Sequence, residues 1–373
     1  MKIAAFNVEN LFDRPKAFNL QDQAKGAAIT DAVAEINVLI GKDVYSDADK
    51  KRMLALIKQL KLTSPRPPFA IFRKIRGSFW KRPKTGPMVI TAKGRADWVG
   101  WVELRTEPNN AVAVMNTGRV IMEAAADILA VIEAEDRVAL KQFSEQVLLK
   151  LGGDPYDEIM LIDGNDERGI DVGLMLTNGY SVGLMRSHIA DMRENGERIY
   201  SRDCPEYQVI APSGETIWIL PNHFKSKFGG NDENSIAKRR DQARRTAEIY
   251  EGLRAEGHDK IVVLGDLNDT PESEPLQRLL ADTDLMEVSE HPNFSTGAFA
   301  GKGTYGLGND SNKIDYLLLS PALFARVTAA GIFRKGAWPG SRPKRWEVFP
   351  ELDKDIHAAS DHHLIWVELS DLP

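Results

Sequence analysis

The chain has 373 residues, of which 43% are hydrophobic and 27% charged, so it can form one large globular domain or two modest ones. Its net charge of −6 excludes a protein coated in positive charge but allows a local basic groove, because nucleic-acid binding depends on where charge lies. The single cysteine, Cys204, excludes an intramolecular disulfide and a thiolate cluster for zinc, and we expect an unreactive thiol.

The N-terminal segment MKIAAFNVENLF does not have the pattern of a signal peptide, since its short apolar run is broken at Asn7 and Glu9. No run of roughly 18 or more apolar residues occurs, so we expect no membrane span. We therefore predict a cytoplasmic monomer without a stable protein partner, although a removed leader would leave no trace in this sequence.

The first expected elements are a short buried strand at 3–6 and helical segments within 28–62, including 47–60. Residues 65–95 then contain nine Lys or Arg and no Asp or Glu, interleaved with Phe69, Phe72, Phe79 and Trp80. This basic and aromatic stretch, which extends to Trp101, allows two interpretations. It fits a nucleic-acid-binding surface, in which cations neutralise phosphates and rings stack on bases. It also fits a loop-rich subdomain whose aromatic side chains form a small core of their own.

Strands dominate the rest of the chain. We expect helices at 116–126, 137–151, 235–254 and 274–281, and strands at 128–132, 159–162, 171–176, 216–220, 260–264, 314–319 and 364–369. Many successive strands are too close in sequence for helical crossovers. This spacing favours an α/β fold with two packed sheets flanked by helices over a singly wound parallel sheet.

Polar side chains cluster at the ends of the predicted buried strands. The clusters are Asn7 and Glu9; Glu133, Glu135 and Asp136; Asn222 and His223; Asp266, Asn268 and Asp269; and Asp361, His362 and His363. Burying several carboxylates together is costly unless a cation compensates. Oxygen ligands without cysteine favour Mg²⁺, Mn²⁺ or Ca²⁺ over zinc, and neighbouring histidines can contact a phosphate or move a proton near neutral pH. The pattern predicts metal-assisted phosphoryl chemistry.

Six segments occur in a recognisable order: FNVENLF, DILAVIEAED, NHFKSKFGG, VVLGDLND, KIDYLLLS and SDHH. In this order the chain resembles the endonuclease/exonuclease/phosphatase family, which includes DNase I and exonuclease III, from Asn7 to His363. The resemblance implies a four-layer αββα sandwich of two mixed sheets flanked by helices. It departs from the family at Ile132, where relatives often have Gln.

The resemblance also implies roles for residues near a metal and an attacking water. Asn7 resembles the Asn beside the metal, Glu133 the metal-binding Glu, and Asp361 a second metal-side carboxylate. Asp266 resembles the Asp that orients or deprotonates the attacking water. Asn268 resembles its partner, which positions the water and the phosphate.

Further residues resemble those that contact the phosphate. His362 is similar to the His that binds the scissile phosphate, and Asp315 to the carboxylate that orients this His. His223 resembles the additional histidine of the DNase I and sphingomyelinase branches. Arg168 could hold a phosphate and Asp171 could orient His223, or the two could form an internal salt bridge.

Two lysines and two longer segments complete the prediction. Lys225 and Lys227 could contact substrate phosphates or belong to an ordinary solvated loop. Because Asn7 and Glu133 are 126 residues apart, we expect one catalytic domain over 1–373 with a family-atypical insertion at about 15–112. We expect a second basic and aromatic loop, 333–346, near the site entrance.

The remaining cationic and histidine residues have no motif support. We expect a solvated helix face from Arg239, Arg240, Arg244 and Arg245. We expect His188, His258, His291 and His357 to be surface or loop residues and Asp269 to have a capping or turn role. Glu135 and Asp136 could belong to the site or could merely cap the next helix.

The leading functional prediction is a Mg²⁺- or Mn²⁺-dependent nuclease that cleaves DNA, RNA or both by in-line attack of water. A phosphatase or phospholipase acting on inositol phosphates or sphingomyelin is a rival enzyme class. A non-catalytic binding module is a rival of a different kind, against which the intact set of site residues argues. The sequence leaves open whether cleavage is endo- or exonucleolytic.

Overall fold

The computed structural model describes residues 1–9, 23–83, 85–105, 110–166, 169–227, 232–341 and 344–370. Residue contacts divide the chain into two compact units, which we describe separately. Unit 1 comprises Met1–Phe12 and Asn109–Pro373, and unit 2 comprises Asp13–Pro108. Unit 2 spans most of the range in which we expect an insertion. That it is an insertion relative to the family stays a prediction.

Unit 1 contains two large mixed sheets among its described residues. The first has the order β14 (Phe294–Ser295), β16 (Val327–Phe333), β17 (Leu364–Leu369), β1 (Lys2–Asn7), β6 (Ile128–Ala134), β8 (Asp171–Leu176) and β7 (Glu158–Leu161). The second has the order β13 (Met286–Glu287), β15 (Asp315–Leu319), β12 (Ile261–Asp266), β11 (Thr216–His223), β10 (Glu206–Ile210) and β9 (Ser181–Arg186). All seven strands predicted downstream of residue 116 are present.

The two sheets pack face to face because their central strands are apolar on both faces. In β1, Ile3 and Ala5 join a core shared by both sheets, whereas Ala4 and Phe6 point to the opposite face. Strand β12 contributes its even-numbered apolar residues to the shared core and its odd-numbered ones to a separate outer core. This period of two is the geometry of a strand, and it explains why these strands read as continuous apolar runs.

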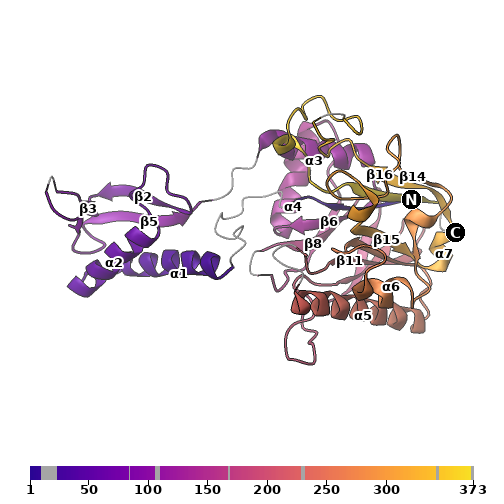
Figure 1. Cartoon of the computed structure of the whole chain (residues 1–373), viewed down its shortest axis with the longest axis horizontal. Helices are drawn as coiled ribbons and strands as arrows, with labels where there is room; N and C mark the ends of the chain where they lie inside the picture. Colours follow the sequence, from indigo (N-terminus) through magenta and orange to yellow (C-terminus); the bar gives the residue numbers. More distant parts are fainter. Residues whose placement is uncertain are drawn as a thin grey trace. The chain divides into compact units, whose positions relative to one another are not determined.

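Helices cover the outer face of each sheet (Figure 1). On the first sheet lie α3 (Ala111–Ala124) and α4 (Arg137–Phe143), which continues as a π-helix over Ser144–Leu148. On the second lie α5 (Glu233–Ala255) and α6 (Gln277–Leu280). The predicted four-layer αββα sandwich is confirmed. Short helical segments complete the unit: α7 (Pro321–Phe324) and 3₁₀ turns at Glu274–Leu276, Val288–Glu290, Asp310–Asn312 and Asp355–His357.

Unit 2 has a hydrophobic core of its own. Helices α1 (Gln23–Ile40) and α2 (Asp47–Gln59) pack against the antiparallel pair β2 (Ala70–Gly77) and β5 (Trp98–Leu104), and β3 (Trp80–Lys81) pairs with β4 (Val89–Ile90). The ring of Phe72 stacks on those of Phe79 and Trp98 with centroid separations of 5.4 and 5.0 Å. Most aromatic side chains of the basic stretch therefore form a small core, as expected for a subdomain with its own interior.

None of the described helices is long and apolar enough to cross a bilayer.

Two side chains of unit 1 that the sequence analysis gave no role in the site, Cys204 and Arg239, are buried. Burial raises the pKa of the Cys204 thiol to about 12, which keeps the thiol protonated and unreactive at neutral pH. Arg239 was expected on a solvated helix face, but it is fully buried. Its Nε lies 3.0 Å from Oδ2 of Asp269, so Asp269 is an ion-pair partner as well as a turn residue.

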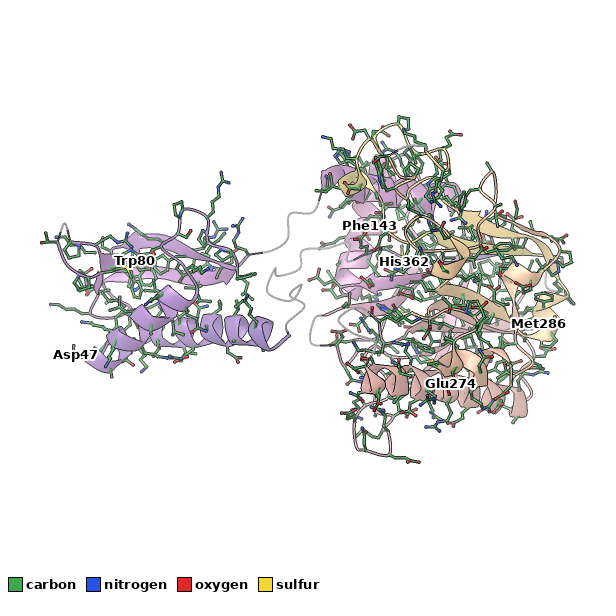
Figure 2. All side chains as sticks on the ribbon, viewed as in Figure 1. Asp47, Trp80, Phe143, Glu274, Met286 and His362 are labelled. Carbon is green, nitrogen blue, oxygen red and sulfur yellow. The ribbon has the colours of Figure 1, made fainter. Side chains whose placement is uncertain are left out.

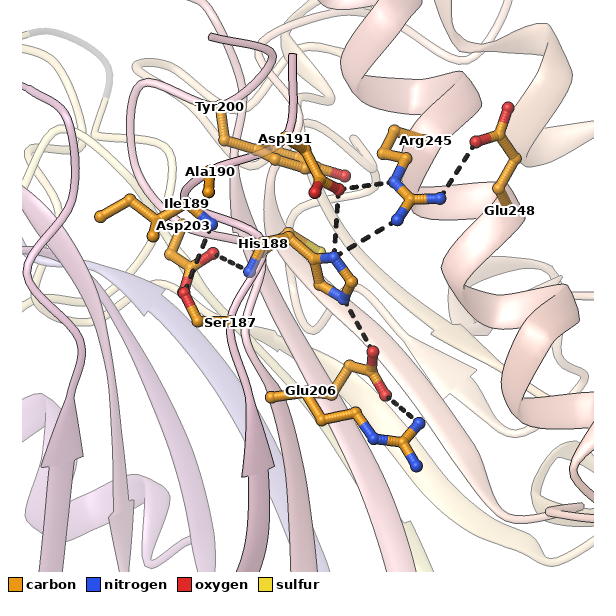
Figure 3. Close-up of polar contacts among 12 residues, drawn as sticks. Ser187, His188, Ile189, Ala190, Asp191, Tyr200, Asp203, Glu206, Arg245 and Glu248 are labelled. Carbon is orange, nitrogen blue, oxygen red and sulfur yellow. Dashed lines mark hydrogen bonds and ion pairs between the residues drawn. The ribbon is translucent and has the colours of Figure 1, made fainter.

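A polar cluster surrounds His188, which lies, as expected, in a loop, the one that connects β9 to β10, but is partly buried there (Figure 3). Its Nε2 lies 2.7 Å from Oε1 of Glu206 and its Nδ1 lies 3.1 Å from Oδ2 of Asp191. The Nε of Arg245, on α5, donates to the same Asp191 oxygen at 2.6 Å. The cluster ties the 187–203 segment to a strand and a helix, and it removes Arg245 from the expected solvated face.

This arrangement predicts a pH-dependent contribution to stability. Burial alone would lower the pKa of His188, but the hydrogen bond to Glu206 and the charges of Asp191 and Glu206 raise it above 6.5. A raised folded-state pKa stabilises the protein fully below the unfolded pKa and loses this effect as pH rises through the folded value. We expect His188→Gln to lower the free energy of unfolding by about 1–3 kcal/mol at acidic pH. The difference from wild type should shrink well above pH 6.5, as measured by thermal unfolding; a pH-independent difference would contradict the assignment.

Candidate active site

The topology of the first sheet brings separated residues to one edge. Strands β1 and β6 are parallel, so Asn7 and Glu133 lie near their carboxyl ends. Strand β17 is antiparallel to β1, so Asp361 and His362, which precede it, reach the same edge. Three segments more than a hundred residues apart therefore supply neighbouring side chains.

The second sheet presents its own polar residues in the same way. Strands β11 and β12 are parallel and end at His223 and Asp266. Strand β15 is antiparallel to β12 and begins at Asp315, which lies opposite Asp266 in the register of the two strands. Since like charges repel and these carboxylates are almost fully buried, the pair needs compensating donors.

Asp266 receives those donors from both sheets. The Nδ2 of Asn7, in the first sheet, lies 3.2 Å from Oδ2 of Asp266. The backbone N of Asn268 donates to Oδ1 at 2.8 Å, and its Nδ2 donates to Oδ2 at 3.1 Å. The Nε2 of His223 is 3.6 Å from the same Oδ2. Even so, burial and the nearby charge of Asp315 raise the pKa of Asp266 to about 8.

His362 and Asp315 form a second buried pair. The Nδ1 of His362 lies 2.8 Å from Oδ2 of Asp315, while its Nε2 points toward Asp361 at 3.7 Å and Asp266 at 3.9 Å. Burial alone would lower the pKa of His362, but the charges of Asp315, Asp266 and Asp361 raise it well above its usual value. The Nε2 side of the ring is thus available to donate to an anion in the site.

Several site residues have left-handed backbone conformations. Glu133 has φ +67°, Asn268 has φ +53° and Glu9 has φ +49°. Such conformations are uncommon for residues other than glycine and are typical of functional sites, where surrounding structure holds them. Gly265, just before Asp266, has φ +123°, and a Cβ there would lie 2.1 Å from the Asn222 carbonyl oxygen. The backbone at this position requires glycine.

Carboxylates also gather on the Asn7 side of the site. Oε2 of Glu9 accepts a hydrogen bond of 2.9 Å from the backbone N of Asp361. Desolvation and the charges of Asp361 and Glu133 raise the pKa of Glu9 to about 7. Glu133 Oε1 lies 3.6 Å from the His223 Nε2. Sequence reasoning assigned no role to Glu9, although its place two residues after Asn7 at a strand end was a usable signal.

This donor set fits a divalent cation. Glu9, Glu133 and Asp361 offer hard carboxylate oxygens, and Asn7 offers an amide oxygen, which are the ligands that Mg²⁺, Mn²⁺ and Ca²⁺ prefer. Among the described residues, ligand atoms of Asp266, Asp315 and His362 also lie within 4.8 Å of one another. Because His362 already pairs with Asp315, the carboxylates and Asn7 are the residues that could hold a cation.

Comparisons with known proteins agree with this geometry. The model of the endonuclease/exonuclease/phosphatase family matches residues 89–335, more than half of the chain. The chain belongs to this family. It is therefore a hydrolase that acts on phosphate esters, and enzymes of the family are generally dependent on a divalent metal. The matched range begins inside unit 2.

Solved structures of family members resemble the chain in fold. A mannosyl-6-phosphatase from Bacteroides thetaiotaomicron has a TM-score of 0.51 and 14% identity, with 69% of this chain and 91% of that chain covered. The human Nocturnin catalytic domain has a TM-score of 0.47 and 14% identity (coverage 69% and 87%), and truncated Caenorhabditis elegans TDP2 has 0.46 and 15% (69% and 89%). No curated protein sequence matches the chain.

The structure thus brings together the eight family-type residues predicted from the motifs: Asn7, Glu133, His223, Asp266, Asn268, Asp315, Asp361 and His362. Their individual catalytic and metal-binding roles stay predictions. Of the two interpretations of Asp136, the structure bears out capping, because its side chain accepts a hydrogen bond from the Ala139 N at the start of α4.

The four predicted substrate-binding residues have different surroundings. Arg168 lies outside the described residues. Asp171 is buried, and desolvation together with the charge of Asp163 raises its pKa to about 7. Lys225 donates its backbone N to Gln242, and the ammonium of Lys227 forms an ion pair with Asp269. Their contacts with a substrate stay predictions.

Three cations in the described part of the second basic loop have internal partners. Arg334 is buried, and its guanidinium donates to the carbonyl oxygens of Gly301 and Gly303. Lys335 pairs with Glu123 at 3.1 Å, and Arg345 donates to Asn309 at 2.6 Å. The internal partners of these three cations hold the loop in place, and its position near the site entrance stays a prediction.

Proposed function

We propose that the chain is a divalent-metal-dependent phosphodiesterase that cleaves nucleic acid. The observation that carries the proposal is the convergence of two polar groups at one edge of the sandwich. One is the carboxylate set Glu9, Glu133 and Asp361, which suits a cation. The other is Asp266 beside the His362–Asp315 pair, which suits activation of water and recognition of a phosphate.

The chain's own residues then have distinct tasks. Asn7 and Asn268 hold the Asp266 carboxylate so that it accepts the proton of a water attacking phosphorus in line with the leaving oxygen. His362, oriented by Asp315, donates from Nε2 to a phosphate oxygen. His223, whose Nε2 is also near Oδ2 of Asp266, does the same. A metal bound at Glu133, Asn7 and Asp361 supplies charge neutralisation for the phosphate.

The choice of nucleic acid rests on the distribution of charge. Unit 2 contains 19 Lys or Arg against 10 Asp or Glu, whereas the rest of the chain contains 29 against 44. The formal charges are therefore +9 and −15. A strongly acidic catalytic unit repels a polyanion, so a separate basic unit is the physical means of attracting one.

The test is cleavage of plasmid DNA and of RNA with Mg²⁺, with Mn²⁺ and with EDTA, beside an Asp266→Asn variant. We expect metal-dependent cutting that EDTA and the substitution abolish. Turnover of a small monoester such as mannose 6-phosphate, with both polymers intact, would instead assign a phosphatase. Turnover of sphingomyelin alone would assign a phospholipase, and turnover of an inositol phosphate alone would assign an inositol phosphatase. Inactivity on every ester would leave a binding module.

A further inference from the structure

The β2–β5 pair of unit 2 has two unlike faces. On one face Phe72, Trp98 and Val102 pack into the core with α1 and α2. The ring of Trp80, labelled in Figure 2, packs against the ring of Phe72. On the other face, Trp101 of β5 lies directly opposite Arg73 of β2 and keeps 43% of its surface exposed. A large aromatic side chain left this open on a strand face is available to a partner.

Cations follow one another along the adjoining β2–β3 segment. Lys74, Arg76, Lys81 and Arg82 are all exposed, and none of them has an ion-pair partner within the described ranges. Arg73 differs, because its Nε lies 2.7 Å from Oε2 of Glu103. A register shift between Lys74 and Arg76 inserts Ile75, which is 67% exposed. The register pairs Lys74 with Gly100 and Arg76 with Val99, so these two side chains lie on opposite faces of the pair and both border the outer edge of β2. We call Lys74, Ile75, Arg76, Lys81, Arg82 and Trp101 the hairpin surface.

We propose that the hairpin surface docks a single-stranded nucleic acid, with phosphates at the four cations and an unpaired base stacked on Trp101. This inference rests on the proposed function and adds where the polymer is held. Like charges gathered without counter-ions are mutually unfavourable, and a polyanion relieves that cost while releasing its own counter-ions. An exposed ring favours a single strand, because the bases of a duplex already stack on each other.

Charge also argues against a lipid surface as the occupant. Of the hairpin surface only Ile75 and Trp101 are apolar, and four of its six side chains are cationic. A membrane-bound segment needs a broad apolar face to enter the acyl boundary. The hairpin surface is mostly cationic and carries one exposed aromatic side chain, which is the composition of single-strand binding grooves.

The experiment uses the full chain in EDTA, so that binding is measured without cleavage. Anisotropy of a fluorescein-labelled oligothymidylate, titrated at several salt concentrations, reports affinity and its salt slope. The variant Lys74→Gln/Arg76→Gln/Arg82→Gln is compared with Lys51→Gln/Lys58→Gln/Lys61→Gln, which removes equal charge at other exposed positions of unit 2. Trp101→Ala is compared with Trp101→Phe, which keeps a ring.

We expect the hairpin triple variant to lower the slope of log affinity against log salt by about 2, since each lost phosphate contact removes about 0.7 for a single strand. Trp101→Ala should weaken binding by roughly 5- to 150-fold, and Trp101→Phe by much less. Equal binding by the hairpin and control triples, a preference for duplex, or binding to anionic vesicles in place of the oligonucleotide would each overturn the proposal.

Hydrolysis of a small diester tests the proposed function separately from the docking proposal. Bis(p-nitrophenyl) phosphate is too small to need the hairpin surface, so the triple variant should hydrolyse it at the wild-type rate while cutting polymer more slowly. If wild type hydrolyses neither the diester nor any nucleic acid, the proposed function fails whatever the binding result. If it cuts polymer and the hairpin variants bind and cut like wild type, only the docking proposal fails.

Discussion

Asp266→Asn is expected to lower kcat/KM for a phosphodiester by about a hundredfold or more, because in the proposed mechanism it removes the group that accepts the proton of the attacking water. Asparagine keeps the shape of aspartate and still accepts from the Asn268 backbone N through its oxygen, while its amide nitrogen faces the Nδ2 donors of Asn7 and Asn268. The Tm is therefore measured beside the activity, to separate lost chemistry from lost hydrogen bonds. Asp282→Asn, in an exposed turn, is the matched control and should retain activity.

The same substitution has an opposite effect on stability. Burial and Asp315 raise the folded-state pKa of Asp266 from 3.8 to about 8, so ionisation of this group costs stability as pH rises between these values. Asparagine carries no charge and escapes that cost. In metal-free buffer near neutral pH we expect the variant to have a Tm equal to or above that of wild type. A clearly lower Tm would mean that the activity loss reflects unfolding, and unchanged activity would remove Asp266 from the mechanism.

The second large effect concerns the His362–Asp315 pair. His362→Asn is expected to lower kcat by about a hundredfold or more, since the side chain touching the phosphate loses its imidazolium. Asp315→Asn should also lower kcat, because Asp315 acts on the substrate through His362, at 2.8 Å. If it is a positioning residue, the double variant will be about as slow as His362→Asn alone. Losses that multiply in the double variant would show independent roles.

The pH profile adds a measurement that a structural role would not change. The charge of Asp315 is among the causes that raise the pKa of His362, so Asp315→Asn should move the alkaline limb of the kcat profile to lower pH. His188→Gln is the control, because His188 is also held between carboxylates but its partners Glu206 and Asp191 lie outside the site. It should lose stability and leave kcat unchanged.

The sequence by itself determined the family and the type of fold, and it predicted which residues form the site. Asn7, Glu133 and Asp266 could be identified because a strand ends where its apolar run ends, and the polar residue that follows must lie at a sheet edge. The order of the six motifs assigned the remaining partners and the αββα sandwich. Both signals are local, since each motif is readable within about ten residues.

Only the tertiary structure decided which charges are internal and which are free. Arg239, Arg245 and Arg334 are cations in helix and loop patterns that look solvated, yet their partners Asp269, Asp191 and the 301–303 carbonyls are 30 or more residues away. Such pairings depend on the approach of distant segments, which no local pattern encodes. The same dependence on tertiary packing explains why Phe72 and Phe79 form a core while Trp101 stays open.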